Sequence, residues 1–459
     1  MQLTDLNSAG GIGANCLFLE WNGLNIVIDS GLNPKKDGLD ALPAFDCLEG
    51  KRVDLILVTH CHLDHIGALP VLVRRHPEAR VIMSLPSHVL AARMLHNSCN
   101  IMMRLRGERG IADYPLYTHR EVTHLHKKIS AILYYRTCRI EHGPHDLEVT
   151  MNPVGHVPGA AGFRLNYQGI SVYITGDCLF TPQRILDSGT KIEGTCDILI
   201  TETTRGATER VPTSDRESEV TRLLAGIGEV MGAGGSVLIP AFAFGRMQEI
   251  LSIVHDGWKR GILSPCPVYG SGLGISLADY FDEITRKLGG LNFRKSILRE
   301  LKLRALPEDF NPTGGMHNGR NGQVPALYVL SSGMMVENTP SYAAAAALLA
   351  NPRNAVFFVG YCDPDTPGGR LLRTAPGEPF LFEELDHTTT LDASVVRFDL
   401  SSHADREELL HQAEALQPQA IVLTHGDTEA RGWFASQLSG SLPDARVIDP
   451  QPLAPVSLL

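Results

Sequence analysis

The sequence predicts an α/β protein in which one layered domain is interrupted by a second domain of the same class. Strand-like and helix-like segments alternate along most of the 459 residues. Reactive polar residues stand where several predicted strands end, as expected when ligands bind beyond the carboxyl ends of strands. Two of these residues, Asp177 and His425, are 248 residues apart, whereas one strand–helix–strand unit takes about 30 residues. If both belong to one site, a whole domain is inserted between them.

The elements of the predicted outer domain begin with a β-hairpin. Segments 16–19 and 25–28 are strand-like and are joined by Asn22-Gly23, a hairpin turn signal. The second segment ends at Asp29. Five later strands also lead to reactive residues: 149–154 to His156, 171–174 to Asp177, 197–200 to Glu202, 395–400 to His403, and 420–423 to His425.

The inserted segment has its own alternation. Its predicted strands are 236–240, 267–269, 326–330 and 356–360, and its predicted helices are 246–258, 276–288 and 340–349. Residues 313–323 are Gly-rich and polar, which predicts a loop. We therefore expect three parts: residues 1–207 and 386–459 form one domain, and residues 208–385 form the other.

The bulk composition is that of a folded globular protein. Apolar residues make up 43% and charged residues 20% of the chain. No apolar stretch reaches the ~20 residues of a membrane helix, and the N-terminus has no basic start or long apolar core. Nine cysteines without framework spacing favour reduced thiols. We expect a cytoplasmic protein with no membrane contact.

Net charge bears on nucleic-acid binding. The formal charge of -10 argues against non-specific coating of nucleic acid. One local region differs, because the segment Arg286–Arg304 holds seven basic residues and one acid. A phosphate-binding rim and a solvated helix face explain this run about equally well.

The segment Thr59-His60-Cys61-His62-Leu63-Asp64-His65 carries four metal-ligand side chains directly after the apolar residues 55–58. Imidazole and carboxylate are ligands that zinc prefers. On an extended backbone His60 and His62 point to the same side. Asp64 and His65 then fall in the turn and the first helical positions, facing a second point. One short segment thus supplies ligands to two adjacent cations.

His156 and Asp177 each have a structural explanation when taken alone. Together with the run His60–His65, however, they suggest a pair of zinc ions. We assign His60, His62 and His156 to one zinc ion, and Asp64, His65 and His425 to the other, with Asp177 bridging both and Asp29 orienting the first run. Two metal ions ~3.5–4 Å apart share a water and lower its pKa. A metal-activated hydrolase is the expected class.

In these residues the chain resembles the metallo-β-lactamase superfamily and, within it, the β-CASP nucleases. The β-CASP nucleases include RNase J and the endonuclease of the pre-mRNA cleavage and polyadenylation factor. The superfamily elements match Asp29, the His60–His65 run, His156 and Asp177. The β-CASP additions match Glu202 after Leu199-Ile200-Thr201, His403 in Ser401-Ser402-His403-Ala404-Asp405, and His425 in Val422-Leu423-Thr424-His425-Gly426.

The resemblance implies an αββα sandwich with an inserted α/β β-CASP domain, and a di-zinc site between the two domains. It implies a phosphodiesterase that cleaves RNA by attack of a metal-bridging hydroxide, as an endonuclease, a 5′-exonuclease or both. His403 is then the acid for the leaving oxygen, paired with Glu202; we class Asp64 and Asp29 with these as catalytic. Flanking phosphate would meet Ser331, Ser332 and Gly333, or Arg246 at the start of a helix, although a plain turn and a structural ion pair fit these positions nearly as well.

Several alternatives stay open. RNase J carries a further C-terminal domain and the archaeal relatives an N-terminal KH-like module, neither of which matches here, so we expect a compact enzyme or a subunit that receives RNA from partners. A homodimer is an expectation by analogy. The rival functions are a small-ester or thioester hydrolase, a DNA-directed nuclease, and an inactive scaffold subunit of a nucleic-acid processing complex.

Overall fold

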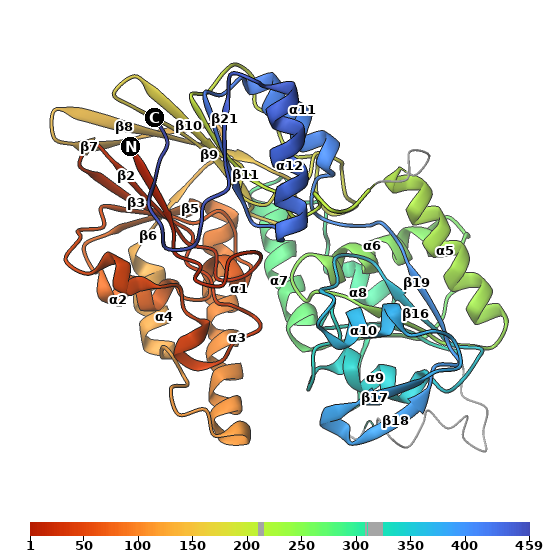
Figure 1. Cartoon of the computed structure of the whole chain (residues 1–459). Coiled ribbons are helices and arrows are strands. Elements are labelled where there is room, and N and C mark those ends of the chain that lie inside the picture. Colours follow the sequence, from red (N-terminus) through yellow and green to blue (C-terminus); the bar gives the residue numbers. More distant parts are fainter. Residues whose placement is uncertain (210–214, 308–309, 311–324) are drawn as a thin grey trace. The chain divides into compact units, whose positions relative to one another are not determined.

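The computed structural model describes residues 1–209, 215–307, 310 and 325–459 (Figure 1). The predicted loop 313–323 lies outside these residues. The chain divides into two compact units. The first combines Met1–Pro182, Ser188–Arg210 and His403–Leu459, and the second combines Gln183–Asp187 and Val211–Ser402. A domain inserted into another is the arrangement that the distance between Asp177 and His425 predicts.

The first unit contains two seven-stranded sheets. One sheet runs in the order β22 (Val456–Ser457), β1 (Gln2–Asp5), β2 (Leu17–Trp21), β3 (Leu24–Ile28), β4 (Leu55–Leu57), β5 (Arg80–Ser84), β6 (Ile129–Ile132). The other runs in the order β21 (Arg446–Ile448), β20 (Ala420–Thr424), β11 (Ile198–Glu202), β10 (Ile170–Ile174), β9 (Ala161–Tyr167), β8 (His145–Pro153), β7 (Thr137–His142). β2 and β3 form the predicted antiparallel hairpin.

The two sheets share one apolar core. Leu19 and Ile26 from the first sheet and Phe163 and Ile200 from the second belong to one buried cluster. β8 and β9 alternate between buried and less buried positions, so that one face of each strand packs inward. The sheets therefore pack face to face as a sandwich.

Helices cover the outer faces of the sandwich (Figure 1). On the first sheet these are α1 (Leu63–Ile66), α2 (Leu69–Arg75), α3 (Leu85–Arg109) and α4 (His119–Lys128), and on the second they are α11 (Arg406–Leu416) and α12 (Thr428–Ser441). The short 3-10 helices η1 (Gly38–Ala41) and η2 (Phe45–Leu48) precede β4. The first unit is thus the expected αββα sandwich. Among the described residues, no helix combines the length and the apolarity of a membrane span.

The second unit is built on a six-stranded sheet. Its order is β14 (Arg304–Ala305), β13 (Val268–Gly270), β15 (Leu327–Leu330), β12 (Val237–Pro240), β16 (Ala355–Phe358), β19 (Ser394–Arg397), and all neighbours are parallel. Its other elements are α5 (Arg216–Gly232), α6 (Arg246–Lys259), α7 (Gly272–Lys287), α8 (Ser296–Glu300), α9 (Pro340–Leu348), α10 (Pro367–Arg373), η3 (Glu383–Leu385), and the hairpin of β17 (Pro379–Phe382) and β18 (His387–Thr390). Every residue of β12, β15 and β16 is buried, as is typical of a parallel sheet covered on both faces.

The predicted boundaries of the insertion need one correction. The start at residue 208 lies close to the observed boundary, but the end at residue 385 is too early. Residues 386–402 belong to the second unit, because β19 pairs with β16 at the edge of its sheet. The second unit also takes in Gln183–Asp187, where the backbone N–H groups of Arg184 and Ile185 donate to the Glu249 carboxylate.

Candidate active site

The predicted metal ligands all lie in the first unit, at the strand ends of its two sheets. His60, His62, Asp64 and His65 come from the loop after β4 and from α1, while His156, Asp177 and His425 follow β8, β10 and β20. The prediction placed the site between two domains. Every one of these ligand residues comes from the first unit, because the strands that carry them build its two sheets.

Two glycines allow the chain to turn sharply beside the ligands. Gly176 has a φ of 54°, and a Cβ atom there would lie 2.9 Å from Cβ of Thr59. Gly155 has a φ of 77°, and its Cβ atom would lie 2.3 Å from the carbonyl oxygen of Leu179. Only glycine tolerates both the conformation and the lack of space. These positions therefore fix how the next residue of each loop enters the site.

Three imidazoles converge on one point. Nδ1 of His62 lies 3.0 Å from Nε2 of His60 and 3.1 Å from Nε2 of His156. Ligands of a tetrahedral zinc ion at ~2.0–2.1 Å would be about 3.3 Å apart. The spacing of these nitrogen atoms therefore fits one zinc ion with three histidine ligands.

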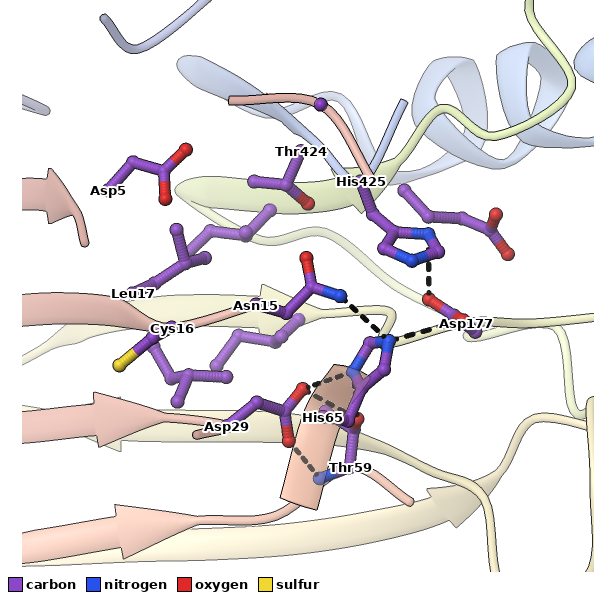
Figure 2. A pocket seen from close by; sticks show the side chains of 16 residues that line it. Asp5, Asn15, Cys16, Leu17, Asp29, Thr59, His65, Asp177, Thr424 and His425 are labelled. Atoms are coloured by element: carbon purple, nitrogen blue, oxygen red, sulfur yellow. Dashed lines mark hydrogen bonds and ion pairs between the residues drawn. The ribbon is translucent and has the colours of Figure 1, made fainter. Parts of the chain in front are cut away.

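A second set of ligands lies next to the first. Oδ2 of Asp64 is 3.4 Å from Nε2 of His425 and 3.7 Å from Nε2 of His65. Asp177 reaches both sets, because its Oδ2 atom lies 3.8 Å from Nε2 of His60 and 3.4 Å from Nε2 of His65. Figure 2 shows His65 between Asp29 and Asp177, and His425 in contact with Asp177, with Nδ1 of His425 at 3.2 Å from Oδ1 of Asp177. One carboxylate thus stands where it could bridge two cations.

The chemistry of the residues fits metal ions at these two points. Oδ1 of Asp177 is buried and accepts no hydrogen bond from the described residues, so a lone pair is left for a cation. Burial, and then the neighbouring His65, hold the pKa of His60 well below its usual value. A neutral imidazole is the form that binds a metal ion.

Electrostatics also favour cations around His65. Burial alone would lower its pKa, but Asp177, Asp29 and Asp64 outweigh burial and hold the pKa well above its usual value. The same carboxylates would stabilise a divalent ion in place of that proton. Burial would raise the pKa of Asp64, yet His65 and His425 hold it below its usual range, so the carboxylate is ionised and available as a ligand.

Asp29 lies behind the ligands, as a residue that orients them would. Its Oδ1 accepts the backbone N–H of Thr59 at 2.7 Å, and its Oδ2 accepts the Thr59 hydroxyl at 2.7 Å. Oδ2 also lies 2.8 Å from Nδ1 of His65. The ring therefore donates Nδ1–H to the carboxylate and turns Nε2 toward the metal position.

His403 and Glu202 form a pair beside the same cluster. Nδ1 of His403 is 2.8 Å from Oε2 of Glu202, which is 1% exposed. Burial would lower the pKa of His403, but the charge and hydrogen bond of Glu202 raise it above the usual value. The ring of His403 lies 4.5 Å from that of His156, centroid to centroid. This pair can keep a proton next to the metal position.

One further grouping is geometrically possible. Ligand atoms of Asp177, Glu202, His403 and His425 also lie within 4.8 Å of one another. His403 could therefore be a ligand rather than a proton donor, a distinction that zinc content after substitution resolves.

The predicted phosphate contacts lie in the second unit and carry less weight. Arg246 is 4% exposed, and its guanidinium donates to the carbonyl oxygen of Leu400 at 2.6 Å and to the side chain of Gln183. These contacts favour a structural role, because burial and protein partners occupy the two terminal nitrogen atoms that would meet phosphate. The N–H of Ser331 is likewise donated to Oγ of Ser271 at 2.9 Å.

The structure gives little support for phosphate binding by Ser332, by Gly333 or by the basic segment Arg286–Arg304. α9 begins only at Pro340, so Ser332 and Gly333 do not directly precede a helix. Within the run, Arg286, Lys287 and Lys295 form ion pairs with Asp282, Glu283 and Asp279. These pairs favour a solvated helix face over a continuous phosphate-binding rim.

Sequence reasoning missed three polar residues that contact the ligands. The amide nitrogen of Asn15 lies 3.0 Å from Nε2 of His65. The hydroxyl groups of Thr59 and Thr204 contact ligand histidines, at His60 and His425. Thr59 stands next to a ligand in the sequence and Thr204 stands two residues after Glu202, which are weak signals; Asn15 carries none.

The fold and this ligand set define a domain of the metallo-β-lactamase superfamily, and three family models match the chain in order. Residues 9–98 match the metallo-beta-lactamase superfamily, residues 247–371 the Beta-Casp domain, and residues 390–446 the Zn-dependent metallo-hydrolase RNA specificity domain. The chain belongs to the β-CASP family of this superfamily.

Curated relatives agree with this membership. The chain is 27% identical to endoribonuclease YSH1 of Gibberella zeae over 92% of its own length and 53% of the relative's. It is 26% identical to cleavage and polyadenylation specificity factor subunit 3 of Dictyostelium discoideum, over 100% and 57% of the two chains. It is 25% identical to the Integrator complex subunit 11 homolog of the same organism, over 95% and 59%. The chain thus spans between half and two thirds of these relatives.

A solved structure shares the fold. The crystal structure of a protein of unknown function from Enterococcus faecalis V583 matches with a TM-score of 0.53 and 12% identity, over 99% of each chain. This likeness concerns the fold alone.

Proposed function

We propose that this protein is a zinc-dependent endoribonuclease that hydrolyses phosphodiester bonds of RNA. The observation that carries the proposal is the position of Asp177, whose carboxylate lies between two sets of ligands while the His403–Glu202 pair lies beside them. The names of the relatives, which include endoribonucleases and a cleavage factor subunit, support RNA as the substrate.

Each part of the site has a role in this reaction. His60, His62 and His156 would hold one zinc ion, Asp64, His65 and His425 would hold the other, and Asp177 would contact both. When bound, the two ions supply an activated water and offset negative charge at phosphorus. The protein's own residues then position the ions and manage protons.

His403 is placed to protonate the leaving 3′ oxygen. Its Nδ1–H is donated to Glu202, so Nε2 is the atom that can deliver a proton to substrate. The raised pKa favours the charged form of the ring, as an acid requires. Glu202 fixes the direction of the ring, because its other oxygen accepts the backbone N–H of Cys178 at 2.6 Å.

Two substitutions separate the roles. We expect Asp64→Ala to lower both zinc content and cleavage of a labelled RNA, because it removes a ligand. We expect His403→Ala to reduce cleavage about 100-fold or more while zinc content stays at two ions per chain. The matched control is His411→Ala, which changes an exposed histidine on α11 and should alter neither quantity.

The outcomes distinguish the competing functions. Equal zinc loss in both variants would make His403 a ligand. Turnover of a chromogenic ester with no cleavage of RNA at any salt concentration would indicate an ester hydrolase. Cleavage of a DNA oligomer in preference to a matched RNA would change the substrate class, and protein purified under mild conditions without zinc would favour an inactive scaffold.

A further inference from the structure

Thr204 occupies a junction between the ligand set and the proton donor. Its hydroxyl oxygen lies 2.5 Å from Oε2 of Glu202, 2.9 Å from Nδ1 of His425, and 3.1 Å from the carbonyl oxygen of His425. The residue is 8% exposed. One hydroxyl group therefore contacts both the carboxylate that holds His403 and a predicted metal ligand.

The hydroxyl has one proton to donate, which decides the direction of each bond. The Glu202 carboxylate can only accept, and its contact is the shortest, so Thr204 donates to Oε2. The hydroxyl oxygen is then an acceptor for Nδ1–H of His425. Oδ1 of Asp177, although 3.2 Å from the same nitrogen, makes no hydrogen bond with it.

This direction fixes which nitrogen of His425 is free. With the proton on Nδ1, a neutral ring has its lone pair on Nε2, the atom that lies 3.4 Å from Oδ2 of Asp64, the other ligand atom proposed for the same zinc ion. A metal-binding histidine needs its second nitrogen protonated and hydrogen-bonded to keep the ring in place. Thr204 supplies that contact for His425.

The same arrangement occurs at the other ligand set. The Thr59 hydroxyl donates to Oδ2 of Asp29 at 2.7 Å and lies 3.1 Å from Nδ1 of His60. A carboxylate, a threonine hydroxyl and a ligand imidazole again form a chain, which leaves Nε2 of His60 facing the metal position. The loops after two different strands, β4 and β11, thus contain the same arrangement of hydrogen bonds.

We propose that Thr204 is a positioning residue that couples the two halves of the site: its hydroxyl sets the tautomer of His425 for metal binding and holds Glu202 in the orientation that directs His403. The part concerning cleavage rests on the proposed ribonuclease function, whereas the part concerning metal binding does not. Replacing the hydroxyl should therefore affect zinc affinity and cleavage together.

Thr204→Val tests this inference, because valine keeps the shape and removes the hydroxyl. Zinc affinity is measured by competition with a chromogenic chelator. We expect one of the two zinc ions to bind about 10- to 100-fold more weakly, since loss of a residue that orients a ligand has effects of that size. At saturating zinc, kcat for RNA cleavage should fall while KM changes little. Thr204→Ser, which keeps the hydroxyl, should restore both quantities to near the wild-type values.

Thr203→Val is the matched control. Thr203 is the adjacent residue and is fully buried, and its hydroxyl donates to the carbonyl oxygen of Thr424 at 2.9 Å rather than to a ligand side chain. Its only bond to a ligand residue among the described residues is made by the backbone N–H, which valine keeps. We expect it to lower stability and leave both zinc affinities unchanged.

Three results would overturn the inference: wild-type zinc affinities in Thr204→Val, failure of Thr204→Ser to restore them, or the same weakening in Thr203→Val. If the wild-type protein cleaves no RNA, the proposed function fails, and the zinc titrations still decide the role of Thr204.

Discussion

Replacing Asp29 with asparagine should lower both the stability of the protein and its affinity for zinc, although Asp29 is a residue that orients ligands and not a predicted ligand. Three donors point at this carboxylate: the N–H and hydroxyl of Thr59, and Nδ1 of His65. The side chain is 4% exposed, so water does not replace lost bonds. Asparagine suits the position otherwise, because it has nearly the same shape and tolerates the φ of 60° found there.

The magnitude follows from the donors that an amide cannot satisfy. If the amide oxygen takes the place of Oδ2, the Thr59 hydroxyl and His65 keep an acceptor, but the amide NH2 group then faces the N–H of Thr59. A buried donor without an acceptor costs about 1–3 kcal/mol, and each of the two remaining bonds loses about 1 kcal/mol when its acceptor becomes neutral. We expect the free energy of unfolding of the metal-free protein to fall by about 3 kcal/mol or more.

Two assays measure the effect. Urea unfolding followed by circular dichroism gives stability, and chelator competition gives zinc affinity, which should fall about 10- to 100-fold because His65 loses the carboxylate that orients it. The control is Asp197→Asn. Asp197 also accepts three bonds, from the N–H and hydroxyl of Ser171 and from Gln419, but none comes from a ligand. Wild-type zinc affinity in Asp29→Asn, or an equal loss in Asp197→Asn, would refute the reasoning.

Two other predictions concern buried carboxylates. Glu202→Gln should keep both zinc ions but reduce the single-turnover rate of RNA cleavage about 100-fold, because the neutral amide no longer favours a charged His403; a rate within a few-fold of wild type would remove Glu202 from the mechanism. Asp5→Asn should stabilise the metal-free protein at pH 8 and much less at pH 4. Burial raises the pKa of Asp5 from 3.8 to about 6, so the folded state holds this proton more tightly than the unfolded chain does, and ionisation between these pH values costs about 3 kcal/mol of stability. Urea unfolding of both proteins at the two pH values checks this, and a stability difference that does not grow with pH would contradict it.

Local spacing was enough to predict where the first four candidate ligands lie relative to the strand and the helix. His60 and His62 precede α1, and Asp64 and His65 lie within it, as the step from strand to helix requires. These positions depend only on the geometry of a few consecutive residues, which a sequence pattern reports directly. The alternation of strands and helices likewise predicted a layered α/β domain with a second domain inserted into it, whereas the αββα sandwich was predicted from the family resemblance.

The roles of Glu202 and His403 could be predicted only from the family resemblance, and the contacts of Arg246 could be seen only in the structure. Glu202 and His403 have no spacing signal of their own, and only their match to β-CASP motifs suggested a pair. Arg246 begins α6 as predicted, yet packing against Leu400 buries it, which no local pattern could reveal.

The sequence by itself determined which residues could bind metal and that a long segment separates them. The tertiary structure decided which atoms face one another: the Asp177 carboxylate between two ligand sets, the Thr204 hydroxyl between Glu202 and His425, and the return of the chain at His403 rather than near residue 386. The physical reason is that directions of hydrogen bonds and edges of sheets depend on partners far away in the chain, and a linear pattern carries no information about distances between them.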